Sequence, residues 1–227
     1  MTDERQRVVT GPTAWISWGL VAASFLVAFW GVAQVPAGEQ IPMHWNAAGE
    51  VDGWGSRWTL LLTPASGVFV VGLVSVVAKV EPRRKNMAAS MGPLRILMVS
   101  MAGFMFLLTV LVTMSGMGRE VDVSSWMTVG VGLLIVVIGN MLGKIRSTYT
   151  FGVRTPWTLA SDLSWQKTHR VMGFSWVVIG AATAALGLFG LSEVAIWVLL
   201  GGLLGSVVLG TVYSYFVWRD DPDKREE

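Results

Sequence analysis

The chain contains no cysteine and only two histidines among its 227 residues. Without cysteine, disulfide bonds, thiolate metal sites and cysteine nucleophiles are excluded, although this absence does not identify the cellular compartment. The two histidines, His44 and His169, lie in different polar segments. The sequence therefore offers no thiolate chemistry and no cluster of imidazoles.

Charge is also scarce, because only 14% of the residues are charged, whereas soluble domains average about a quarter. Hydrophobic residues make up 53% of the chain, and the mean hydropathy is +0.57. The formal net charge of +2 gives no basic footprint for nucleic acid. This composition predicts an integral membrane protein whose first partner is the lipid bilayer.

Long apolar runs take the place of the missing charge. A helix needs about 20 mostly apolar residues to cross a bilayer, and it satisfies its own backbone polar groups there. Six runs meet this requirement, which predicts an all-α integral membrane protein with six transmembrane helices. The second run is the weakest, because it contains Pro64 and ends at Lys79. The runs are residues 14–35, 60–80, 94–117, 125–142, 171–191 and 194–218.

The basic residues between the runs predict the orientation. Fifteen of the 17 lysines and arginines fall in the two tails, the second loop and the fourth loop, and only Arg57 and Arg119 fall on the opposite side. Cytoplasmic segments of membrane proteins carry the excess of Lys and Arg. We therefore expect both termini in the cytoplasm and a multi-pass location in the plasma membrane.

The runs and loops divide the chain into five regions. We expect a cytoplasmic tail, two spans around an outer loop, a middle region with the third span, a region with spans four to six around an inner loop, and a charged cytoplasmic tail. These regions are residues 1–13, 14–80, 81–124, 125–217 and 218–227.

The spans contain no ionisable residue near their centres. Such residues usually mark ion or proton pathways, so a transporter or channel remains only the alternative function. Asn140 is the one notable amide, and an interhelical hydrogen bond is its simplest role. The pairs Gly139/Gly143 and Gly201/Gly205 have the four-residue spacing that lets helix backbones approach closely.

The outer loop gathers four polar side chains within nine residues, namely His44, Asn46, Glu50 and Asp52. A tight hydrogen-bonded turn, a surface that binds a ligand and a divalent metal site all fit this composition. The spacing does not fit a calcium-binding loop. We expect no metal, and we retain these four residues as candidate binding residues.

The inner loop is more structured than a connector requires. Pro156 favours an extended Thr155, and Ser161 followed by Asp162 is typical of a helix start. A helix from this point runs into span five, with Trp165 and His169 on one face. We expect helix four to extend through Lys144 and Arg146. The loop is then either an interfacial helix anchored by tryptophans and anionic headgroups, or a binding site at the mouth of the bundle.

The segment "GNMLGKIRSTYTFGVRTPWTLASDLSWQKTHRVMG", residues 139–173, closely resembles the signature of the SdpI family of bacterial membrane immunity proteins. The matching residues are Gly139, Asn140, Gly152, Arg154, Thr155, Pro156, Trp157, Thr158, Trp165, Thr168, His169, Arg170 and Gly173.

The outer loop resembles a companion domain of unknown function that often precedes the SdpI part. The shared pattern is Ile-Pro-x-His, then Asn, then Gly-Glu-x-Asp-Gly-Trp-Gly. It falls here on Ile41, Pro42, His44, Asn46, Gly49, Glu50, Asp52, Gly53, Trp54 and Gly55.

The resemblance implies a protein of the bacterial plasma membrane that gives immunity to a secreted antimicrobial peptide, and we expect neither enzymatic activity nor a cofactor. In the best-studied system of the family, the immunity protein also holds a transcriptional repressor at the membrane. A peptide toxin outside and a cytoplasmic repressor inside are therefore the expected partners. The candidate binding residues at the inner side are Asn140, Arg154, Thr155, Pro156, Trp157, Trp165, His169 and Arg170.

Overall fold

A computed structural model describes residues 11–224. Most of the expected N-terminal tail, with Arg5 and Arg7, and the end of the C-terminal tail, with Arg225, lie outside the described residues. The elements in chain order are α2 (Pro12–Gln34), β1 (Gln40–Trp45), β2 (Val51–Ser56), the 3-10 helix η1 (Arg57–Leu61), α3 (Leu62–Val80), α4 (Arg84–Ala89), α5 (Met91–Gly116), α6 (Val123–Leu142), α7 (Pro156–Ala160), α8 (Asp162–Leu188) and α9 (Ser192–Arg219).

Six helices within residues 11–224 are long and apolar enough to cross a membrane, and they coincide with the six predicted runs. The second span joins η1 and α3, and it is helical despite Pro64 because that residue lies in the first turn of α3. The prediction of a helical membrane protein is therefore confirmed. The β1–β2 hairpin is an addition that the sequence patterns did not indicate.

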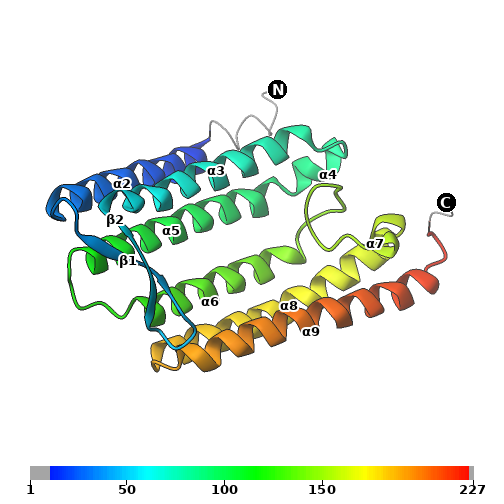
Figure 1. Cartoon of the computed structure of the whole chain (residues 1–227). Helices are drawn as coiled ribbons and strands as arrows, with labels where there is room; N and C mark the ends of the chain where they lie inside the picture. Colours follow the sequence, from blue (N-terminus) through cyan, green and yellow to red (C-terminus); the bar gives the residue numbers. More distant parts are fainter. Residues whose placement is uncertain (1–10, 225–227) are drawn as a thin grey trace.

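The spans form two groups of three (Figure 1). Helices α2, α3 and α5 make one group, and α6, α8 and α9 make the other. The hairpin lies at one end of the bundle, and the short helices α4 and α7 lie at the other. The two loops that carry the sequence motifs are therefore at opposite ends of the molecule, as the charge pattern predicts.

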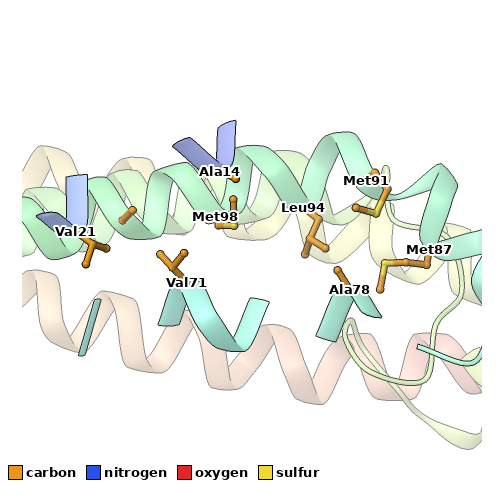
Figure 2. Packing of buried hydrophobic residues seen from close by; sticks show 9 residues of the cluster. Ala14, Val21, Val71, Ala78, Met87, Met91, Leu94 and Met98 are labelled. Atoms are coloured by element: carbon orange, nitrogen blue, oxygen red, sulfur yellow. The ribbon is translucent and has the colours of Figure 1, made fainter. Parts of the chain in front are cut away.

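Small and flexible side chains fill the core of the first group. Ala14 and Val21 of α2 meet Val71 of α3 and Met98 of α5, and all four are buried (Figure 2). Met87 of α4 closes the end of this cluster. Methionine adapts its shape to irregular gaps, so the short α4 packs onto the ends of longer helices without a strict fit.

Glycine holds the second group together. A Cβ atom at Gly132 would lie 2.5 Å from the Ala184 nitrogen, and one at Gly139 would lie 2.7 Å from the Gly173 oxygen. The close approach predicted for Gly139 is therefore correct. The prediction for Gly201 and Gly205 is wrong, because a Cβ atom there would meet nothing within 4 Å. These two residues lie on a face of α9 that no other described element covers.

The outer loop forms an antiparallel hairpin with an irregular register between Pro42 and Trp45. Gly53 lies opposite His44, where a Cβ atom would come within 2.8 Å of the His44 Cβ. Ile41 anchors the first strand, since it is buried against a cluster that includes Val32 of α2 and Leu60. The hairpin is therefore tied into the bundle at its base.

The tip of the hairpin reaches the second group of helices. Gly49 has a positive φ of 87°, and a Cβ atom there would lie 3.2 Å from the Ser124 hydroxyl of α6. A pocket of about 340 Å³ at the tip is lined by Ala48 and Gly49 together with the first turns of α6 and α9. The hairpin thus bridges both groups of spans at one end of the bundle.

Candidate functional site

His44 and Asp52 form a pair on the hairpin. The His44 Nδ1 lies 2.5 Å from Asp52 Oδ1, and both side chains are exposed, at 72% and 46%. The strands place the two residues on adjacent positions of the register, since His44 is opposite Gly53. The pair is therefore built across the strands and open to solvent.

Asn46 and Glu50 close the turn of the hairpin instead of joining this pair. Asn46 Oδ1 accepts a hydrogen bond from the Glu50 backbone N–H at 3.0 Å, and its Nδ2 donates to Glu50 Oε2 at 3.2 Å. The four outer candidates thus separate into two pairs. Within residues 11–224, no three His, Cys, Asp or Glu side chains are grouped as metal ligands would be.

Exposed aromatic rings flank the hairpin pairs. Trp54 and Trp58 are 59% and 57% exposed, and the Arg57 guanidinium lies 5.5 Å from the Trp58 ring centre. Arg57 also donates to the Val35 carbonyl at 2.9 Å. This end of the bundle therefore presents an imidazole, carboxylates and indole rings together.

At the opposite end, the inner loop begins α7 as its sequence indicates. Thr155 is extended, with φ −97° and ψ 162°, and Pro156 follows as the first helical residue. Thr155 and Thr158 cap each other's backbone N–H groups, which is a reciprocal capping arrangement. Thr155 Oγ1 also lies 3.0 Å from Ser214 Oγ of α9. Thr155 and Pro156 therefore fix the loop to the bundle.

The predicted N-cap and helix of span five are confirmed. The Ser161 hydroxyl accepts from the Ser164 N–H at 2.8 Å and donates to Asp221 Oδ2 at 2.5 Å. Helix α8 then runs without a break from Asp162 to Leu188. Ser161 therefore ties the segment after α9 to the start of α8.

Trp165 and His169 lie on one buried face of α8, as predicted. Their rings stack with centres 4.0 Å apart and an interplanar angle of 19°. Trp165 is fully buried and donates to the Ile145 carbonyl at 2.8 Å. An interfacial anchoring role for Trp165 is therefore wrong, because its ring supports the loop from inside.

His169 uses both ring nitrogens, one to its own helix and the other to the loop. Nδ1 lies 2.8 Å from the Trp165 carbonyl, and Nε2 accepts the Val153 backbone N–H at 2.9 Å. Gly152 has a φ of 104°, and a Cβ atom there would lie 2.7 Å from His169 Nε2. His169 is wholly buried, so it positions Arg154 and its neighbours and is not itself open to a large ligand.

The other candidate residues of the inner side lie in different environments and do not form one cluster. Arg154 is exposed and donates to the Tyr149 carbonyl at 2.6 Å, and Trp157 packs edge-on against Tyr215 at 5.3 Å. Arg170 is exposed on α8. Asn140 is also exposed, and residues 11–224 give its side chain no hydrogen bond, so the expected interhelical bond is wrong.

The predicted extension of helix four is wrong as well. Helix α6 ends at Leu142, and the chain then turns away. The turn is held because the Arg146 N–H donates to Ser90 Oγ at 3.0 Å, while the Ile145 carbonyl accepts from Trp165. The helix therefore ends at its C-cap residue Gly143, and side chains distant in sequence hold the turn that follows.

Glu81 is the residue of this end that sequence reasoning missed. It is 2% exposed, and its carboxylate accepts from the Arg83 and Thr150 backbone N–H groups at 2.9 Å and from the Thr150 hydroxyl at 2.6 Å. The Tyr149 N–H adds a further bond. Burial alone raises the pKa of Glu81, but these hydrogen bonds, that of Thr150 foremost, lower the pKa below its ordinary value.

Arg83 and Asn86 extend this contact. Arg83 donates to Ser147 Oγ and, at 3.0 Å, to the Tyr149 hydroxyl, and its guanidinium lies 4.1 Å from the Tyr149 ring centre. Asn86 Nδ2 donates to the Ser147 carbonyl at 2.7 Å. The segment 81–90 therefore holds the loop 145–154. The sequence did carry a signal for Glu81, because it is an acidic residue that directly follows an apolar run and precedes Pro82.

Comparison with known proteins gives two matches that follow this architecture. Residues 144–214 match the SdpI/YfhL protein family, and residues 19–68 match a domain of unknown function, DUF1648. The chain is therefore similar to the SdpI family in its C-terminal part, and to DUF1648 in its N-terminal part. The SdpI match covers the inner loop with α7, all of α8 and most of α9, and the DUF1648 match covers the hairpin.

The SdpI likeness also extends along nearly the whole chain. It is 24% identical over 211 residues to "Immunity protein SdpI" of Bacillus subtilis (strain 168), covering 90% of this chain and 95% of that protein. No solved structure matches the chain. The six apolar helices and the similarity to this immunity protein place the chain in the bacterial membrane as a multi-pass protein. Glu81 and Arg83 lie outside both matched regions.

Proposed function

We propose that this protein gives its cell immunity to a secreted, membrane-active peptide toxin, and that it does so without enzymatic chemistry. The observation that carries the proposal is the likeness to an immunity protein over 90% of the chain. A likeness of that extent includes both the hairpin and the inner loop. The proposal therefore concerns the whole bundle and not one matched segment.

The hairpin is the part that we propose to meet the toxin. With the basic loops in the cytoplasm, the hairpin faces outward. It offers exposed indole rings for apolar contact, and the His44–Asp52 pair for polar contact. A peptide that enters membranes carries both kinds of surface, and aromatic rings are suited to the membrane–water boundary.

The inner loop is the part that we propose to contact a cytoplasmic repressor. Arg154 is exposed on a loop whose backbone is held by His169, Glu81 and Thr158. Arg83 and Tyr149 secure the same loop from the first group of spans. A rigid frame with an outward arginine supports recognition of an acidic partner surface.

The proposal is tested by deleting the gene and exposing the cells to culture supernatants of their siblings and to a panel of purified secreted peptides. We expect deletion to sensitise the cells to at least one peptide, and expression in a naive host to protect against the same peptide. An unchanged sensitivity across the panel in both strains would contradict the proposal. Ion or solute flux in liposomes, at rates above an empty control, would instead favour a channel.

A further inference from the structure

A basic pocket lies where α6 ends and α8 begins. It encloses about 430 Å³ between the turn that follows Leu142 and the first turns of α8. The lining contains four cationic side chains and no acidic one. The lining residues are Gly143, Lys144, Ile145, Arg146, Leu163, Gln166, Lys167 and Arg170.

The four cations Lys144, Arg146, Lys167 and Arg170 are all exposed. Asp162 and Arg146 both line the adjoining pocket of about 230 Å³, but Asp162 does not line this one. Four like charges around one hollow repel each other, and an anion that enters it is attracted by all four.

The depth of the pocket matches the level of lipid phosphates. Helix α6 has 20 residues, which span about 30 Å, the thickness of the hydrocarbon core. It ends at Leu142, so the pocket begins directly beyond the hydrocarbon. Helix α8 has 27 residues and a length of about 40 Å. Its first turns, with Lys167, therefore stand in the headgroup layer.

An apolar strip continues from the pocket along α8. Val171, Phe174 and Val178 follow Lys167 at four, seven and eleven residues, so they share its helix face. They are 45%, 72% and 51% exposed on the bundle. Cations above and an open apolar strip below fit a molecule with a phosphate at one end and acyl chains at the other.

We propose that this pocket binds the headgroup phosphate of an anionic phospholipid, whose acyl chains lie along the Val171–Phe174–Val178 strip of α8. A free phosphate ion would bind the Lys and Arg side chains through the same phosphate oxygens as the lipid headgroup. The strip favours the lipid as the source. The site lies on the turn that leads into the inner loop, so a bound lipid would steady that loop.

Native mass spectrometry of the full chain, released from nanodiscs of phosphatidylcholine with phosphatidylglycerol, tests the proposal. We expect the wild-type protein to retain phosphatidylglycerol in preference to phosphatidylcholine. In K167Q/R170Q the apparent affinity for phosphatidylglycerol should fall about 25-fold, since each charge near the surface accounts for about fivefold. K167R/R170K, which keeps both charges, should retain the lipid.

The matched control is R84Q/K85Q, which removes two exposed cations of α4 outside the pocket and should leave lipid retention unchanged. Circular dichroism must show equal helix content for all variants. Equal retention of both lipids by the wild type would overturn the proposal, as would equal losses in the control. Inorganic phosphate that displaces phosphatidylglycerol at low millimolar concentration would also overturn it, because the acyl chains would then contribute nothing. None of these outcomes depends on the toxin.

Discussion

At the scale of single residues, buried polar groups decide the shape of the inner loop. The Glu81 carboxylate accepts hydrogen bonds from the backbone N–H groups of residues 149 and 150. His169 accepts one from the N–H of Val153. A buried backbone donor that loses its acceptor costs about 1–3 kcal/mol. The sequence predicted the face on which His169 lies, because helical spacing is local. It could not predict its partner, because Val153 belongs to a loop without a repeating pattern.

Replacing Glu81 with glutamine should destabilise the protein by about 2 kcal/mol at neutral pH, because charge-assisted bonds become neutral ones. The lowered pKa of Glu81 means that the folded state favours the carboxylate more than the unfolded chain does. This stabilisation is complete above the ordinary value of 4.5 and is lost as the pH falls through the lowered pKa.

Thermal unfolding in detergent between neutral and acidic pH measures this effect. The wild type should lose its advantage over E81Q as the pH falls below 4.5. The matched control is Glu120→Gln, the same change at an exposed carboxylate in the loop before α6. A gap between wild type and E81Q that is unchanged down to the lowest pH would contradict the role given to Glu81.

Replacing Gly152 with alanine should be more damaging than its size suggests. The new Cβ atom would meet the rings of His169 and Trp165 at 2.7 and 2.8 Å, and the φ of 104° strains any residue other than glycine. We expect a loss of about 3 kcal/mol of stability. Gly118→Ala, also at positive φ but with open space around it, separates backbone strain from the clash. Equal losses in both variants would show that packing against His169 is unimportant.

At the scale of elements, the close contact of α6 with α8 organises the second group of spans. Hydropathy predicted all six spans, since each one must satisfy its backbone within the bilayer. Spacing alone did not tell which glycines meet another helix, because both GxxxG pairs read alike. Gly139 faces α8 and Gly201 faces no element described, and only the rotation of each helix in the bundle decides this. The hairpin escaped prediction because Pro42 and two glycines interrupt the alternation of its strands.

Gly132→Ala should lower the stability of the bundle by about 2–3 kcal/mol, because its Cβ atom would lie 2.5 Å from the backbone of α8. Gly201→Ala should leave stability unchanged or slightly increased, since the same methyl group enters open space. Chemical denaturation of both variants in the same micelle compares them directly. A greater loss in Gly201→Ala would show that α9 packs against another element or another molecule.

At the scale of the whole molecule, the two groups of spans are joined at both ends. The hairpin tip meets α6 and α9 at one end, and the segment 81–90 holds the loop 145–154 at the other. The charge count predicted which loops lie together, because charge is read directly from the sequence. The joining contacts depend on Glu81 and Arg83, which lie outside both matched regions. Only the folded structure shows that these two residues contact the loop 145–154.

The absence of native cysteine makes the orientation simple to test. Ala47→Cys places a thiol at the exposed hairpin turn, and Lys85→Cys places one on exposed α4. A membrane-impermeant maleimide should label Ala47→Cys in intact cells and Lys85→Cys only after permeabilisation. The reverse labelling pattern would show that the bundle has the opposite orientation.

The most direct measurement of the central claim is survival of a naive bacterial host that expresses this protein and is exposed to the cognate secreted peptide. The wild type should protect. His44→Ala on the hairpin and Arg154→Ala on the inner loop should each lower the peptide concentration that the host survives by at least about tenfold, which equals 1.4 kcal/mol. Lys85→Gln should protect normally, and all variants should reach equal membrane levels. Full protection by both alanine variants, or none by the wild type, would contradict the account.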